Sequence, residues 1–163
     1  MPQCEIQFGG LDRQGKRVPG APGLFMKGPL IPVEVRLPSQ LAAAFAKGNR
    51  LIPKPQIGLA LIDTGATKSS VDKSVITSLA LPETGRTKLR HASGEVDTTL
   101  RAIEMAFPTI GNALVMLPQA ISCDLGGMEF NNQRVIVLFG RDLLSRFVMI
   151  YNGPRGRVTL ITS

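Results

Sequence analysis

The chain has 163 residues, of which 44% are hydrophobic and 19% are charged. This length and composition predict a globular domain with a hydrophobic core and exclude wholesale disorder. No apolar run reaches the length that crosses a bilayer, and the first residues lack the basic start and apolar stretch of a secretory signal. We therefore expect a cytoplasmic protein with no membrane partner.

Few residues are suited to metal or thiol chemistry. His91 is the single histidine and the two cysteines are Cys4 and Cys123, so a multi-histidine metal site is excluded and no metal or cofactor is expected. The two thiols are expected to be reduced. No nucleophile motif lies near His91, and we interpret it as a surface residue.

The net charge is +7 and the isoelectric point is near 10.0. A basic protein attracts nucleic acid, but these basic residues are scattered and form no long run. Apart from Tyr151 the aromatic residues are phenylalanines within apolar segments, so stacking platforms for bases are not indicated. Nucleic-acid binding is kept only as the least favoured alternative.

Turn signals such as Gly9-Gly10 and Pro22-Gly23 fill the first 30 residues, which we predict to be an N-terminal extension (1–30) with one short strand at 5–8. Residues 31–163 are predicted to form the main domain. Its first half is expected to begin with a strand at 31–37 and a short helix at 41–46, capped by Ser39 and closed by Gly48. A strand at 58–62, a helix at 71–81 stopped by Pro82, and a hairpin at 87–100 that turns at Ser93-Gly94 are expected to follow.

The second half of the domain is predicted to be mostly strand. The apolar run that follows Arg134 is typical of a strand buried on both faces. The expected elements are strands at 103–107, 113–117, 134–139, 147–151 and 157–161, with a helical turn or two at 141–146.

The strand at 58–62 runs directly into the sequence Asp63-Thr64-Gly65-Ala66. Such a strand would carry a carboxylate into a buried site, and the turn at Gly65 would bring its oxygens beside backbone amides. Thr64 offers a hydroxyl that could fix the loop. By itself this tripeptide fits an ordinary turn after a strand equally well.

A second motif lies downstream, where the apolar strand at 134–139 ends in Gly140-Arg141-Asp142-Leu143-Leu144. Together with Asp-Thr-Gly-Ala, this resembles the retropepsin family of aspartic proteases, over roughly residues 31–161. The resemblance implies an all-β, closed-barrel-like domain with one or two short helices.

The resemblance also implies roles for individual residues. Asp63 would be the catalytic carboxylate, supported by the active-site loop Thr64, Gly65 and Ala66. Ala92, Ser93 and Gly94 would form the flap that covers an extended polypeptide substrate, and Gly140, Arg141 and Asp142 would support the site from behind.

This sequence departs from the family pattern in three places. Retroviral members carry an acidic residue where Thr67 stands, so Arg141 needs a different partner. Residues 38–56 resemble an insertion, and residues 1–30 have no counterpart. Arg141-Asp142 could also be a plain solvated helix start, at which Asp142 would be stabilising in any case.

Peptide hydrolysis by this class needs two aspartates, and no second Asp-Thr-Gly or Asp-Ser-Gly is present. We therefore predict a homodimeric endopeptidase with a pair of Asp63 carboxylates at its axis. The alternative is a catalytically inactive module of the same fold that dimerises or binds peptides.

Overall fold

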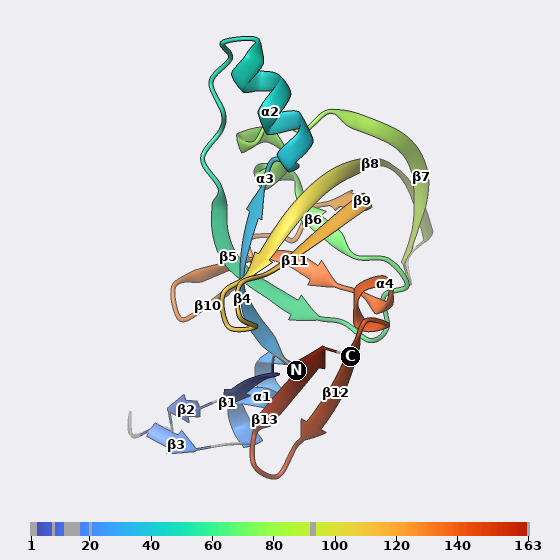
Figure 1. Cartoon of the computed structure of the whole chain (residues 1–163). Helices are drawn as coiled ribbons and strands as arrows, with labels where there is room; N and C mark the ends of the chain where they lie inside the picture. The colour runs from blue at the N-terminus through green and yellow to red at the C-terminus, as the bar shows by residue number, and fades with distance from the viewer. Residues whose placement is uncertain (1–2, 8, 12–16, 20, 92–93, 163) are drawn as a thin grey trace.

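The computed structural model describes residues 3–7, 9–11, 17–19, 21–91 and 94–162 (Figure 1). The strands in these residues are β1 (Gln3–Gln7), β2 (Gly9–Leu11), β3 (Arg17–Pro19), β4 (Leu30–Arg36), β5 (Gln56–Ile62), β6 (Ser70–Asp72), β7 (Glu83–His91), β8 (Gly94–Phe107), β9 (Ala113–Cys123), β10 (Glu129–Phe130), β11 (Gln133–Phe139), β12 (Phe147–Asn152) and β13 (Arg157–Thr162). The helices are α1 (Ala21–Lys27), α2 (Ser39–Lys47), α3 (Lys73–Ser78) and α4 (Arg141–Leu144).

Six of these strands form a closed barrel. Their order is β11-β5-β4-β8-β9-β6, and β6 pairs back onto β11 to complete the circuit. The predicted all-β, closed-barrel-like fold is thereby confirmed, with four short helices in the described residues where one or two were expected. Closure leaves no free edge among these six strands.

The barrel core explains why β5 and β11 are nearly continuous apolar runs. Strand β5 lies between β4, which is antiparallel to it, and β11, which is parallel to it. Phe139 at the end of β11 is fully buried and meets Phe107 edge-on with ring centroids 5.4 Å apart. Burial on both faces selects apolar residues at successive positions, as the sequence pattern indicated.

The two chain ends come together in a separate three-stranded sheet, β1-β13-β12 (Figure 1). Val158 and Leu160 of β13 are buried, whereas Val148 and Ile150 of β12 lie on the exposed face. Strand β13 is the central strand, so both of its edges are already paired within the chain.

The predicted hairpin is present as β7 and β8, which pair from Glu83 and Arg101 to His91 and Gly94. Its turn residues Ala92 and Ser93 lie outside the described residues. Strand β8 continues past the hairpin to Phe107, so the hairpin grows directly out of a barrel strand.

Two helices differ from the sequence prediction. We expected a helix over 71–81, but α3 begins only at Lys73, because Ser70–Asp72 pair with β9 and β11 as strand β6. Ser39 is the first residue of α2 instead of its cap, and its backbone N–H and hydroxyl donate to the carboxylate of Glu104 on β8. Gly48 closes α2 as expected.

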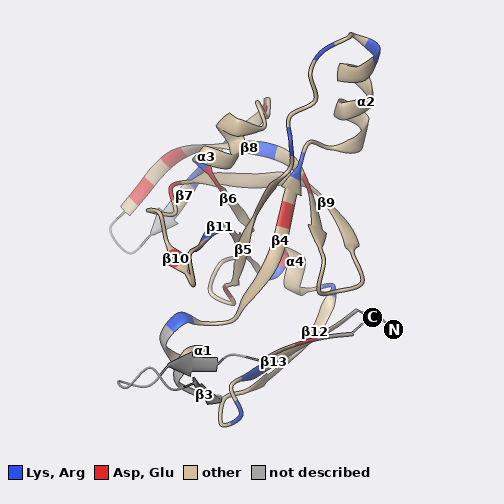
Figure 2. Cartoon of the chain, turned by 90° about the vertical axis from the view of Figure 1, so that its left-hand side faces the viewer, with Lys and Arg blue, Asp and Glu red and all other residues tan. Residues whose placement is uncertain are grey.

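Helix α2 and the loop that follows it project from one end of the barrel (Figures 1 and 2). Phe45 is buried at the helix, and the guanidinium of Arg50 lies 4.0 Å from the centre of its ring. Leu51 in the loop is highly exposed. In the described part of the chain, no helix has the length and apolar character needed to cross a bilayer.

Candidate active site

The parallel pairing of β5 with β11 brings the two sequence motifs to one end of the barrel. Ile62 is paired with Phe139, and Asp63 and Gly140 are the residues that follow. The backbone N–H of Asp63 donates to the carbonyl of Phe139 over 3.0 Å. Because parallel strands end at the same edge of a sheet, segments 76 residues apart become neighbours here.

The carboxylate of Asp63 is held by its own turn. Its Oδ1 accepts hydrogen bonds from the backbone N–H groups of Gly65 (2.9 Å) and Ala66 (3.2 Å). Its other oxygen, Oδ2, accepts no hydrogen bond from the described residues. Asp63 is partly exposed, and Thr64 and Gly65 are exposed, so the turn is open to solvent.

Gly65 is placed where a side chain would disturb this arrangement. A Cβ atom at this position would lie 3.1 Å from Asp63 Oδ1, closer than ordinary van der Waals contact. The hydroxyl of Thr64 forms no hydrogen bond among the described residues, so its expected role in fixing the loop stays a prediction.

The segment after β11 packs directly on the segment after the Asp63 turn. The backbone N–H groups of Arg141 and Asp142 donate to the carbonyls of Ala66 (2.9 Å) and Thr67 (3.2 Å). A Cβ at Gly140 would lie 2.7 Å from the backbone of Lys68, so only glycine permits this approach. Gly140, Arg141 and Asp142 therefore pack against the segment that follows the Asp63 turn.

Ser69 joins the two segments, and the sequence offered no signal for it. Its side chain is fully buried; its hydroxyl donates to Asp142 Oδ1 over 2.6 Å and accepts from the N–H of Gly140 over 3.0 Å. The Ser69 N–H also donates to both carboxylate oxygens of Asp142, at 2.9 and 3.0 Å. Asp142 is thus a structural acceptor and its helix start is not a simple solvated one.

The side chain of Arg141 contacts Thr67 itself, the residue that stands at the non-acidic position. Its Nη2 donates to the hydroxyl of Thr67 over 2.8 Å. The acceptor in this contact is a neutral hydroxyl and not a carboxylate.

Of the predicted flap residues, only Gly94 is described. It has a φ of +133°, a conformation that favours glycine, and a Cβ there would meet nothing within 4 Å. Ala92 and Ser93 lie outside the described residues, as does the side chain of His91. Their proposed contact with substrate stays a prediction.

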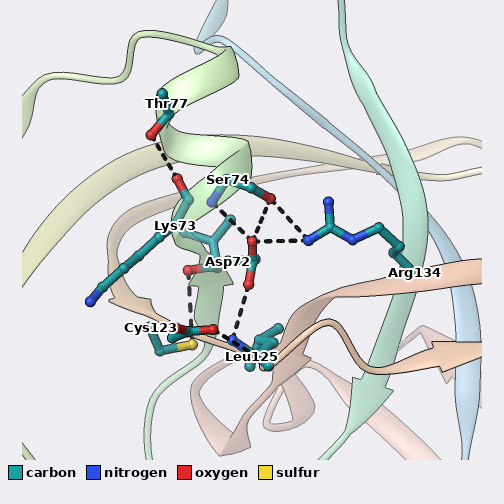
Figure 3. Close-up of polar contacts among 10 residues, drawn as sticks. Asp72, Lys73, Ser74, Thr77, Cys123, Leu125 and Arg134 are labelled. Atoms are coloured by element: carbon teal, nitrogen blue, oxygen red, sulfur yellow. Dashed lines mark hydrogen bonds and ion pairs between the residues drawn. The ribbon is translucent and has the colours of Figure 1, made fainter.

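A buried carboxylate, Asp72, was not predicted as a site residue. Asp72 ends β6 and caps α3: its Oδ1 accepts from the N–H and the hydroxyl of Ser74, and its Oδ2 from the N–H of Leu125 over 3.0 Å (Figure 3). Arg134 Nη2 lies 3.5 Å from Oδ1. An aspartate before an apolar helical repeat is a recognisable cap signal, so this role could have been read from the sequence.

A pocket of about 350 Å³ lies beside Asp72 and is lined in part by Gln56, Gly58, Ser74 and Arg134. Gln56 and Gly58 lie at the beginning of β5 and Arg134 at the beginning of β11, the strand ends opposite to Asp63, and Ser74 lies in α3. The pocket is therefore separate from the Asp63 turn.

Cys123 does not supply a nucleophile. It is a free, buried thiol, as expected, and burial raises its pKa to about 11. It is therefore protonated near neutral pH and unreactive as a thiolate. The side chain of Cys4 lies outside the described residues. Among the residues that the structure describes, no cluster of histidine, cysteine and carboxylate side chains could hold a metal ion.

In comparisons with known proteins, this chain matches solved structures only. No protein-family model and no curated protein sequence matches the chain. Among solved structures, the chain is similar to the crystal structure of a retropepsin-like aspartic protease from Rickettsia conorii. The match has 16% sequence identity and a TM-score of 0.49, and it covers 97% of this chain and 90% of that chain.

Proposed function

We propose that this protein is an aspartic endopeptidase that hydrolyses extended polypeptides with a water molecule activated between two Asp63 carboxylates of a homodimer. The observation that carries the proposal is the state of the Asp63 side chain. One of its oxygens is fixed by two backbone N–H groups, and the other has no partner among the described residues.

The chemistry needs a second carboxylate a few ångströms from the first. Two such groups share one proton, so one can accept a proton from water while the other donates to the scissile amide. Asp142 and Asp72 cannot serve, because their oxygens are already hydrogen-bonded within the fold. A second copy of Asp63 meets the requirement with the same geometry.

The surroundings of Asp63 support this role because they restrict its motion. The turn is attached to Phe139 at one end and to Arg141 through Ala66 at the other. Catalysis by position needs the reacting groups held before the substrate arrives. The closed barrel and the buried Ser69–Asp142 contact provide that rigidity.

The test replaces Asp63 by Asn, which retains an oxygen that Gly65 and Ala66 can bind but removes the group that must ionise. We expect the rate of peptide hydrolysis to fall by at least about 100-fold, the size typical of losing a general acid or base. The midpoint of thermal unfolding should stay nearly unchanged.

Asp124 offers a matched control. Its Oδ1 accepts from the N–H of Gly126 over 2.8 Å, the same local turn that Asp63 makes with Gly65. Asp124→Asn should retain activity. Near-wild-type hydrolysis by Asp63→Asn would end the proposal that Asp63 is the catalytic carboxylate. Peptide binding without hydrolysis by the wild-type protein would favour the inactive peptide-binding module.

A further inference from the structure

Arg141 is an exposed cation beside the Asp63 loop that lacks an acidic partner among the described residues. Its one described side-chain contact is the neutral hydroxyl of Thr67. A guanidinium has five N–H donors in a planar fork, so most of its donors have no protein acceptor here. Five other arginines in the described part of the chain form ion pairs, namely Arg36, Arg86, Arg101, Arg134 and Arg157, whereas Arg50, Arg146 and Arg155, like Arg141, have no ion pair among the described residues.

The nearest carboxylate in sequence cannot neutralise Arg141. Asp142 directs its oxygens to the backbone N–H and the hydroxyl of Ser69 and to the N–H of Leu143. These bonds hold the carboxylate on the inner side of the contact between the two segments. The positive charge of Arg141 is therefore left at the surface.

Lys68, on the loop that follows the Asp63 turn, is a second cation with a neutral partner. Its Nζ donates to the side-chain oxygen of Gln119 on β9 over 3.1 Å. Figure 2 shows that basic and acidic residues are spread over many elements of the described chain. Lys68 lies on the loop that follows the Asp63 turn, and Arg141 packs against that loop. The side-chain partners of both cations among the described residues are neutral.

We propose that Arg141 is a specificity-determining residue that binds an aspartate or glutamate side chain of the substrate, a few residues from the scissile bond. The inference rests on the proposed protease function. Thr67 is four residues from Asp63. Its neighbour Ala66 donates its backbone N–H to the Asp63 carboxylate, and the Ala66 carbonyl accepts from the backbone N–H of Arg141. An extended substrate advances about 3.3 Å per residue, so it would pass the guanidinium within a few residues.

Carboxylates are the ligands that suit this group. An arginine fork accepts a carboxylate through two parallel hydrogen bonds, which adds geometric selection to charge attraction. The hydroxyl of Thr67 occupies one donor and orients the guanidinium without neutralising it. Lys68 strengthens the local positive potential that attracts such a side chain.

A substitution at Thr67 tests the proposal without removing Arg141. Its hydroxyl oxygen is 2.8 Å from Arg141 Nη2, so an aspartate at this position would place a carboxylate within reach of the guanidinium. Thr67→Asp should therefore capture Arg141 inside the protein and remove it from the substrate. The change adds an interaction on an exposed loop, so the fold should tolerate it.

The experiment first digests a mixed peptide library with the wild-type protein and locates the cleaved bonds by mass spectrometry. We expect aspartate and glutamate to be enriched at one position near the cleaved bond. A matched peptide pair with Glu or Gln at that position should then differ in kcat/KM by about tenfold, the effect of one charge-assisted contact. This ratio should fall as salt is raised, because the contact is exposed.

Three variants complete the test. Thr67→Asp and Arg141→Met should each bring the Glu-to-Gln ratio close to one. Lys54→Met removes a cation from the loop between α2 and β5, at the end of β5 opposite to Asp63, and should leave the ratio unchanged. Sedimentation of each variant separates a change in preference from a change in assembly. If Arg141→Met does not fold, Thr67→Asp decides.

The outcomes separate this inference from the function on which it rests. Cleavage without acidic enrichment, or an unchanged ratio in Thr67→Asp, overturns the role of Arg141 and leaves the protease proposal standing. If the wild-type protein cleaves no peptide in the library, the protease proposal fails and this inference fails with it.

Discussion

At the scale of single residues, Asp63 and Asp72 share a local geometry but differ in what surrounds them. Each accepts hydrogen bonds from backbone N–H groups just after it in the chain. Asp72 is 4% exposed and both of its oxygens are used inside the protein, whereas Asp63 is partly exposed and keeps Oδ2 free of described partners. Environment therefore separates a structural carboxylate from a candidate catalytic one.

Asp72 makes a prediction about acid stability. Burial raises its pKa, but the hydrogen bonds from Ser74 and Leu125 and the charge of Arg134 outweigh burial, so the pKa lies below its ordinary 3.8. A carboxylate with a lowered pKa stabilises the fold above the unfolded-state pKa, and that contribution is lost as pH falls through the folded-state pKa.

We expect Asp72→Asn to lower the free energy of unfolding by about 1–3 kcal/mol at pH 7, because the hydrogen bonds to a charged acceptor are lost. Urea unfolding at a fixed protein concentration would show the gap to wild type closing below about pH 3.8, the ordinary pKa of this group. The exposed Asp124→Asn variant is the reference. A gap that does not change with pH would contradict the assigned cause.

Ser69 supports a second prediction at this scale. Ser69→Ala removes the acceptor of the Gly140 N–H and one donor to Asp142, and both groups stay buried or part-buried. Leaving a buried polar group without a partner costs about 1–3 kcal/mol of unfolding free energy. The exposed Ser78→Ala should change it by less than about 0.5 kcal/mol. Equal effects in the two variants would show that Ser69 does not join the segments.

At the scale of elements, the β7–β8 hairpin combines a paired body with a glycine at its turn. Gly94 has a φ of +133° and open space around it, so its backbone conformation and not crowding limits substitution. Valine rarely adopts this conformation, which would cost it about 1–3 kcal/mol of backbone strain. We therefore expect Gly94→Val to alter the backbone conformation of the turn. The paired strands can keep the rest of the fold intact.

We therefore expect Gly94→Val to lower kcat/KM by at least about tenfold, because a flap must present its backbone to the substrate. Its thermal midpoint should fall by only a few degrees. Gly126 has a φ of +61° and equally open surroundings on a different turn, so Gly126→Val is the matched control. Parallel losses of activity in both variants would show that the hairpin is only structural.

At the scale of the whole molecule, the sequence provides a single Asp-Thr-Gly turn, at Asp63, and no Asp-Ser-Gly. The proposed homodimer would bring the turns of two copies together, with the hairpin tips and the terminal sheet as further contacts. Because β13 is paired on both edges, a partner strand could extend this sheet only at β1 or β12. Exposed Val148 and Ile150 lie on the outer face of β12.

Mixing experiments test the shared site. When wild-type and Asp63→Asn subunits exchange in equal amounts, random pairing should reduce the activity per wild-type subunit to about one half, and a threefold excess of the variant to about one quarter. Specific activity should also fall on dilution below the dissociation constant. Activity that stays proportional to wild-type subunits, with monomers seen by sedimentation, would rule the shared site out.

The sequence by itself determined the β-rich character, most strand positions and the Asp63 turn. These features depend on local pattern: continuous apolar runs at β5 and β11, turn residues between strands, and a glycine after the aspartate. Apolar alternation is set by which face of a strand is buried, so it can be read without knowing the neighbours.

Only the tertiary structure decided which segments meet. Ser69 is an ordinary polar residue in sequence, and it becomes the link between two motifs because β5 and β11 run parallel and end together. The helix expected from Val71 is shortened because β6 pairs with β9 and β11, and long-range pairing overrides local helical spacing. The neutral contact between Thr67 and Arg141 likewise depends on packing between segments 74 residues apart, which no local pattern records.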